Sequence, residues 1–127
     1  MQKFVFWSGV YNIVAGFSLF FPMFYELMRI RHPNSVFWSE AFGFFVICLG
    51  ILLVICSRDL KSRASLVYWE GVFRLIFFAH MTWFGVMKDF GLMLAVFGVI
   101  DLFIGLVYLI GLPRVTGKSP TDLLTDM

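Results

Sequence analysis

Four long apolar stretches constrain this sequence more than any other feature. Each holds roughly 20 residues, which is the length that an α-helix needs to cross the hydrocarbon core of a bilayer. A backbone in lipid must satisfy its own hydrogen bonds, and a helix does so within one segment. We therefore predict an all-α integral membrane protein, a bundle of four transmembrane helices over residues 4–27, 37–57, 64–87 and 91–112.

The composition agrees with a membrane protein. The 127-residue chain is 61% hydrophobic and only 14% charged, whereas a soluble domain carries about 25% charged residues. The net charge of +2 offers no basic surface for nucleic acid. We therefore assign residues 1–113 to one bundle, with membrane lipids as surroundings and no nucleic-acid partner.

Turn residues and charges set the ends of the spans and their orientation. The polar run 58–63 is predicted to be a loop, and Pro113 is predicted to end the fourth helix, since proline has no N–H to continue it. Six Lys and Arg residues lie on the side of both termini and three on the other. Cytoplasmic loops carry the excess of such residues, so we predict that both termini are cytoplasmic.

The polar segment 114–127 is predicted to be a cytoplasmic tail. Within it, Ser119, Pro120 and Asp122 are typical of the first residues of a helix. A short amphipathic helix there would lie on the membrane surface or dock on a partner. A disordered tail is an equal alternative.

Charged residues inside two of the spans form the main candidate site. Arg74 and Asp101 lie near mid-span, Glu70 is one turn before Arg74, and Asn12 enters the bundle at comparable depth. Charges at bilayer depth are costly, so they tend to pair and to face the bundle interior. We predict one buried polar cluster of these four residues, with Asp101 or Glu70 as the partner of Arg74.

The predicted cluster carries two carboxylates and one guanidinium. The formal charge of minus one has to be neutralised in a low-dielectric site, by a proton on one carboxylate or by a cation or basic ligand group. The cluster then either holds the bundle together or serves a proton, an ion or a ligand. Both roles stay open.

Small residues accompany the polar ones on the helix faces, as close packing in membranes favours. On a wheel of 100° per residue two such faces are Ser8, Gly9, Asn12 and Gly16, and Gly98, Asp101, Gly105 and Tyr108. A Gly-Val-x-polar pattern recurs at 9–12, 71–74 and 98–101. It is either a decayed repeat or a coincidence, and we favour coincidence because Gly and Val are common in spans.

Two further polar residues are secondary candidates. Glu40 begins the second span, where a carboxylate complements the helix dipole; a gate or binding role is the alternative. His80 has no second histidine at its depth, so we predict no haem or metal site. No CxxC, HExxH, P-loop or dinucleotide motif is present, and we predict no catalytic residues and lean against an enzyme.

A set of residues in the first two spans resembles a known group of proteins. It consists of Gly16, Pro22, Glu40, Gly43, Gly50 and Arg58. On these residues the chain resembles the DoxX-like small four-helix bacterial membrane proteins, although Asn12 precedes the glycine and the basic residue that often follows it is missing. The resemblance implies an accessory role beside larger membrane enzymes, some linked to quinones, in a bacterial inner (plasma) membrane.

We therefore predict a non-catalytic accessory or structural subunit, or an assembly factor, of a larger membrane complex, with other subunits or further copies as partners. One alternative is a small oligomeric proton- or ion-coupled transporter built on the charged cluster. The other is a quinone- or lipid-binding module, with Tyr68, Trp69 and Arg74 near the head group. We predict no cofactor other than such a bound lipid or quinone.

Overall fold

All regular secondary structure in residues 1–125, the part of the chain that the computed structural model describes, is helical. The helices are α1 (Gln2–Ser18), α2 (Pro22–Met28), α3 (Val36–Arg58), α4 (Leu60–Thr82), the π-helical turn η1 (Trp83–Met87), α5 (Leu92–Thr116) and α6 (Pro120–Thr125). The all-α prediction is confirmed. By length and apolar composition α3 and α5 can each cross a membrane, and so can α1 and α2 if this bent pair is one broken span.

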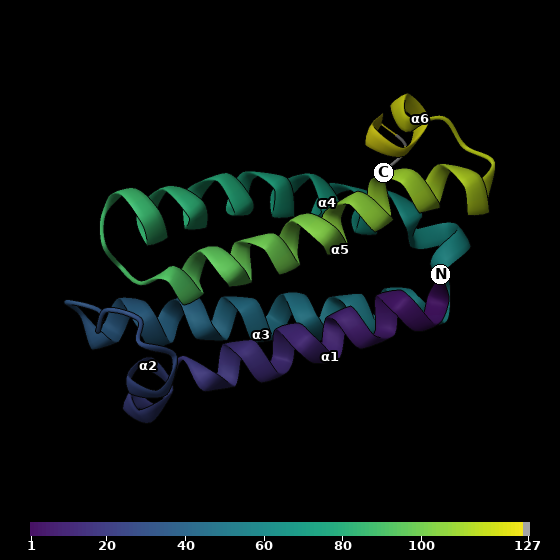
Figure 1. Ribbon diagram of the computed structural model, residues 1–127. Helices are drawn as coiled ribbons and strands as arrows, with labels where there is room; N and C mark the ends of the chain where they lie inside the picture. Colours follow the sequence, from purple (N-terminus) through teal and green to yellow (C-terminus); the bar gives the residue numbers. More distant parts are fainter. Residues whose placement is uncertain (126–127) are drawn as a thin grey trace.

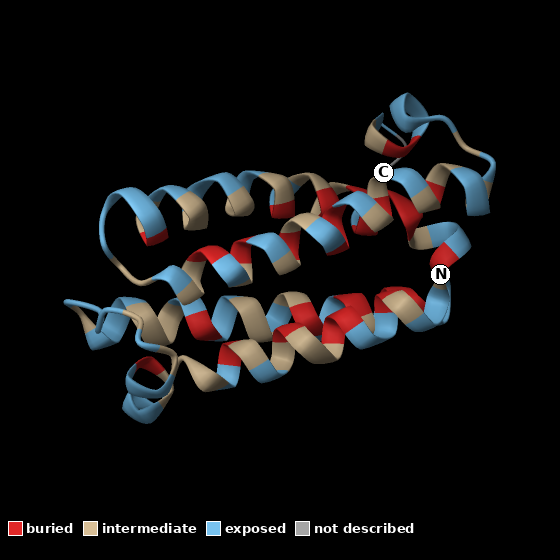
Figure 2. Cartoon of the chain, viewed as in Figure 1, coloured by how far each residue is buried: buried red, intermediate tan, exposed pale blue. Residues whose placement is uncertain are grey.

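The four long helices form two antiparallel pairs. α1 lies along α3, and α4 lies along α5, with the two pairs facing each other (Figure 1). The N-terminus, the connection from α3 to α4, and α6 are at the same end of the molecule. Buried residues concentrate where the helices of a pair touch and where the pairs face each other (Figure 2). Each pair is therefore a tightly packed unit, and the space between the units is left to side chains.

Glycines bring the backbones of α1 and α3 into contact at two points. A Cβ atom on Gly9 would lie 2.7 Å from the carbonyl oxygen of Gly50, and one on Gly16 would lie 2.6 Å from that of Gly43. Both distances are shorter than any ordinary contact, so a larger residue would push the helices apart. Small residues at a helix interface allow this approach, as is common in membrane proteins.

The pair α4 and α5 repeats this layout. A Cβ atom on Gly105 would lie 2.9 Å from the carbonyl oxygen of Gly71, and one on Gly98 would lie 3.4 Å from that of Phe78. In both pairs the two close approaches are separated by seven residues on each helix. The Gly-Val patterns at 9–12 and 71–74 therefore occupy equivalent positions in the two pairs, whereas the one at 98–101 has no counterpart on α3.

The first predicted span is not one continuous helix. The prediction of a helix over 4–27 is wrong, because α1 ends at Ser18 and α2 follows at an angle of 106°. Pro22 is the first residue of α2, and the preceding Phe21 is extended, with φ −108° and ψ 120°. A proline cannot donate to the preceding turn, and it disfavours helical geometry in the residue before it.

Two other predicted boundaries are wrong. α4 begins at Leu60, within the predicted loop 58–63, because Leu60 is 3% exposed and belongs to the core. α5 continues through Pro113 to Thr116, since a proline in the last turn removes only one hydrogen bond. It ends at Gly117, whose φ of +71° is the left-handed conformation that terminates helices.

The helix start predicted in the tail is confirmed, and the tail folds back onto its own bundle. The hydroxyl of Ser119 accepts a hydrogen bond from the N–H of Asp122 at 3.1 Å. Leu123 is fully buried, and the indole Nε1 of Trp69 on α4 donates to the carbonyl of Leu124 at 3.0 Å. The predicted segment 114–127 thus includes α6, while its last two residues lie outside the described part.

The close approach of α1 and α3 makes a first testable prediction. Gly16→Ala places a Cβ against the carbonyl of Gly43, and we expect the overpacking to reduce the free energy of unfolding by about 1–3 kcal/mol. Gly111→Ala is the matched control, since its new Cβ meets only the flexible end of the Met1 side chain. Unfolding in mixed detergent micelles measures both variants, and equal stability of the two would contradict the packing described.

Candidate functional site

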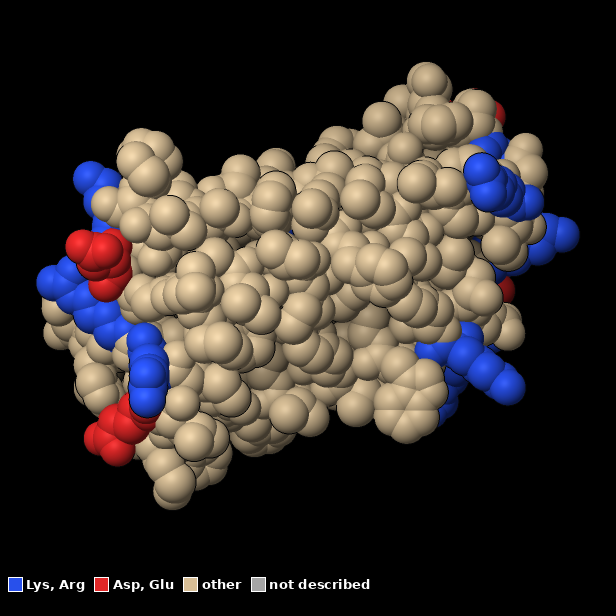
Figure 3. All heavy atoms as spheres, in the orientation of Figure 1, with Lys and Arg blue, Asp and Glu red and all other residues tan. Residues whose placement is uncertain are grey.

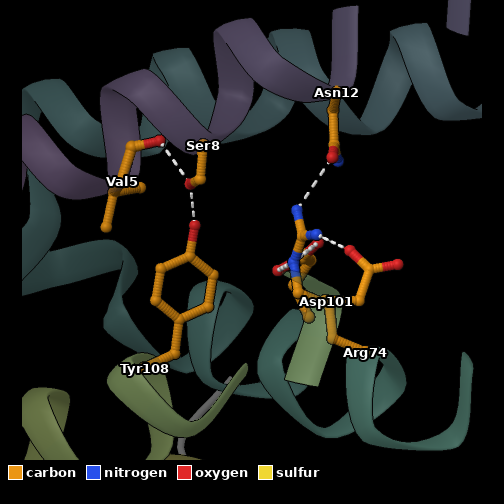
Figure 4. Close-up of polar contacts among 7 residues, drawn as sticks. Val5, Ser8, Asn12, Arg74, Asp101 and Tyr108 are labelled. Atoms are coloured by element: carbon orange, nitrogen blue, oxygen red, sulfur yellow. Dashed lines mark hydrogen bonds and ion pairs between the residues drawn. The ribbon is translucent and has the colours of Figure 1, made fainter. Parts of the chain in front are cut away.

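Arg74 binds side chains from three helices. Its Nε donates to the carboxylate of Glu70, one turn earlier on α4, at 2.7 and 2.8 Å. One terminal nitrogen donates to Oδ1 of Asp101 on α5, and the other donates to Oδ1 of Asn12 on α1 at 2.9 Å (Figure 4). The predicted contact between Arg74 and Asp101 is confirmed, and Glu70 is a second partner rather than an alternative one.

The charge within this polar cluster, Asn12, Glu70, Arg74 and Asp101, is not balanced. Arg74 is 4% exposed and Asp101 is 9% exposed, so both residues are buried. Both oxygens of Glu70 lie close to Arg74. The second oxygen of Asp101 has no hydrogen-bond partner within residues 1–125, and in Figure 4 it points away from Arg74. With both carboxylates ionised, the cluster has a formal charge of minus one, and the oxygen of Asp101 that does not bind Arg74 is its free acceptor.

Two buried hydrogen bonds between side chains join α1 to the pair α4 and α5. One is the hydrogen bond from Arg74 to Asn12. The other links Ser8 of α1 to the buried hydroxyl of Tyr108 on α5 (Figure 4). Because the Ser8 hydroxyl donates to the carbonyl of Val5 at 2.9 Å, it accepts from Tyr108. These bonds fix one pair against the other where few backbone contacts exist.

A cavity of about 380 Å³ lies between the two pairs, on the side of the polar cluster away from Ser8 and Tyr108. All four residues of the cluster line it, and α2 contributes Phe24, Tyr25 and Met28 at its far end. Eight of its lining residues are aromatic. The cavity therefore has apolar walls and one charged end, within the size range of small-molecule sites, about 300–1,000 Å³.

The walls of the cavity follow the repeated layout of the helix pairs. Residues at equivalent positions face it from both sides. These equivalents are Tyr11 and Phe73, Asn12 and Arg74, Ala15 and Phe77, Leu19 and Met81, Phe42 and Phe97, and Val46 and Asp101. The hydrogen bond between Asn12 and Arg74 thus joins equivalent positions across the gap.

The secondary candidates lie outside this cavity. Glu40 is half-buried beyond the first turn of α3, so the predicted helix-dipole role is wrong; it lines a smaller cavity of about 100 Å³ that includes His32. His80 is exposed, with its ring 4.7 Å from that of Phe84. The gate or binding role of Glu40 stays a prediction. Within residues 1–125 no group of three or more His, Cys, Asp or Glu could hold a metal ion.

Two residues assigned to a ligand head group from the sequence are elsewhere. Tyr68 is 7% exposed and belongs to the hydrophobic core, and Trp69 binds α6. Neither lines the cavity. Conversely, sequence reasoning missed the link between Ser8 and Tyr108, because it identified both helix faces but had no signal that would place them against each other.

Comparisons with protein-family models, with curated proteins and with solved structures found no match. The resemblance to DoxX-like proteins stays a prediction.

Removing the guanidinium should be the most damaging change in the cluster. Arg74→Met leaves two buried carboxylates without a cation, and breaking a buried ion pair in this way costs about 3–5 kcal/mol. We expect a loss of that size in unfolding measured in mixed micelles. Arg58→Met, an exposed position at the end of α3, is the control and should change little. A similar loss in both variants would contradict the buried network.

The link between Ser8 and Tyr108 has a natural control in Tyr68. Both tyrosines are buried, but the Tyr68 hydroxyl has no hydrogen bond within the described residues. Tyr108→Phe should lower the free energy of unfolding by about 0.5–1.5 kcal/mol, whereas Tyr68→Phe should be close to neutral. The same unfolding assay measures the difference, and a Tyr108→Phe variant as stable as Tyr68→Phe would refute the bridging role.

Proposed function

We propose that the chain is an integral protein of a bacterial inner membrane. In this proposal α1, α3, α4 and α5 each span the bilayer, and both termini lie on the cytoplasmic side. Charged side chains gather at the two ends of the molecule and leave an uncharged belt between them (Figure 3). Large apolar residues such as Trp7, Phe44 and Phe103 are mostly exposed. The charges in the middle of α4 support a span because Arg74 is buried and pairs with Glu70 and Asp101.

Within that membrane, we propose that the protein binds a small amphipathic molecule, lipid-like or quinone-like, in the cavity between the helix pairs. The cavity with its aromatic walls and charged end is the observation that supports this proposal. Lipid tails are as apolar as the walls of the cavity. A ligand dissolved in the membrane therefore gains little free energy from apolar burial alone when it enters the cavity. The polar cluster therefore determines which head group binds, and the aromatic walls determine the shape of the ligand that fits.

The geometry favours binding over transport. A transported molecule would have to pass from the cavity to the opposite end of the bundle, where Ser8 and Tyr108 join the helix pairs. Fully buried Val5 and Leu112 lie in the core on that side of the cluster. A transporter would thus need a second conformation in which this link is open. The cavity as observed ends at the polar cluster.

A role as a non-catalytic accessory subunit of a larger complex stays a prediction and is compatible with ligand binding. The exposed aromatic surface would meet either lipid or a neighbouring subunit. Such a subunit would hold its ligand beside the catalytic partner. Co-purification of other membrane subunits in mild detergent is the observation that would support it.

Filling the cavity tests the binding function. Ala15 is half-buried and lines the cavity, so Ala15→Phe places a ring inside it. We expect lipophilic molecules to be extracted from the purified wild-type protein and identified by mass spectrometry, and their amount to fall severalfold in the variant. Val99→Phe adds the same ring to an exposed surface of α5 and should retain them. The same extract from wild type and Ala15→Phe would refute the proposal.

A further inference from the structure

We propose that the head group of the ligand is an organic cation, such as a lipophilic ammonium or phosphonium, that pairs with Asp101. This inference rests on the proposed binding function and adds the chemical class of the ligand. It follows from three features of the charged end of the cavity: its net charge, its free acceptor and its aromatic surroundings.

The charge count favours a positive group. Glu70 and Asp101 together outnumber the single guanidinium of Arg74, and none of the other residues that line the cavity is charged. An uncompensated carboxylate in an apolar site is costly. A bound cation removes this cost, whereas an anionic head group would add a further negative charge beside two carboxylates.

The free acceptor lies where a ligand can reach it. Oδ1 of Asp101 accepts from Arg74, while the second oxygen has no partner in the described chain and points away from the arginine (Figure 4). Asp101 itself lines the cavity. Three of the five guanidinium N–H groups are already directed at Glu70, Asp101 and Asn12. Two N–H groups of Arg74 remain, but the free oxygen of Asp101 is the acceptor that points away from the arginine and is open to a ligand.

The walls favour an organic cation over a metal ion. Rings of Tyr11, Phe73 and Phe77 line the same cavity as the cluster, and aromatic faces attract cations within about 6 Å. Hard metal cations need several oxygen ligands, about six to eight for Ca²⁺. Asp101 offers one free oxygen here, and no metal-holding group occurs within residues 1–125. A cation with apolar substituents matches both the charge and the walls.

Two probe ions of nearly equal size and opposite charge test this inference without any substitution. Tetraphenylphosphonium and tetraphenylborate are added separately to the purified wild-type protein in detergent, and native mass spectrometry counts the bound ions. We expect the phosphonium to bind at least about tenfold more tightly than the borate. Equal binding, or tighter binding of the borate, would overturn the inference.

Two carboxylate variants then locate the charge. Asp101→Asn removes the charge at the free oxygen and should abolish the preference for the phosphonium. Glu70→Gln removes the same formal charge from a carboxylate that already faces Arg74, and should keep most of the preference. A larger effect of Glu70→Gln than of Asp101→Asn would refute pairing with Asp101.

The inference can fail while the proposed function stands. In that case Ala15→Phe reduces binding of both probes equally, and wild type binds a neutral ubiquinone analogue better than the phosphonium. If Ala15→Phe affects neither the probes nor the extracted molecules, the proposed function fails as well.

Discussion

The arrangement of this protein depends on satisfying the hydrogen bonds of one buried guanidinium. Arg74 is 4% exposed and draws its partners from its own helix, from α5 and from α1. A charge in such a site is tolerated only when paired, and the pairing is directional because the guanidinium is a planar fork of donors. The relative placement of three helices is thereby specified by a single side chain.

Glycines and polar contacts have separate tasks in the bundle. Within each pair, glycine contacts let the backbones approach closely, as at Gly16 and Gly43. Between the pairs, hydrogen bonds from Arg74 to Asn12 and from Tyr108 to Ser8 cross the interior, and the gap that remains is the cavity. Closer packing between the pairs would have removed the cavity. The cavity thus results from joining two tight units through polar side chains instead of small ones.

The sequence predicted the chemistry of the site better than its architecture. Depth and helical periodicity brought Arg74, Asp101 and Asn12 together correctly, because both depend only on position along a helix. The break at Pro22 was missed because apolar residues on both sides masked it. The cavity could not be foreseen, since periodicity identifies the buried face of each helix but not the distance between helix pairs. The folding of Leu123 onto the bundle likewise depended on a tertiary contact.

The repeated layout of the helix pairs has a consequence for how a molecule would enter the cavity. If the two helix pairs lined the cavity with identical residues, a ligand could bind in two equivalent orientations, with its two ends exchanged. At the position equivalent to Asp101, however, α3 carries Val46, and opposite Arg74 stands the uncharged Asn12. Because of these differences, the wall of the cavity formed by α4 and α5 is charged, whereas the wall formed by α1 and α3 is uncharged. A guest with distinct ends would therefore adopt a single orientation, with its charged end against α4 and α5.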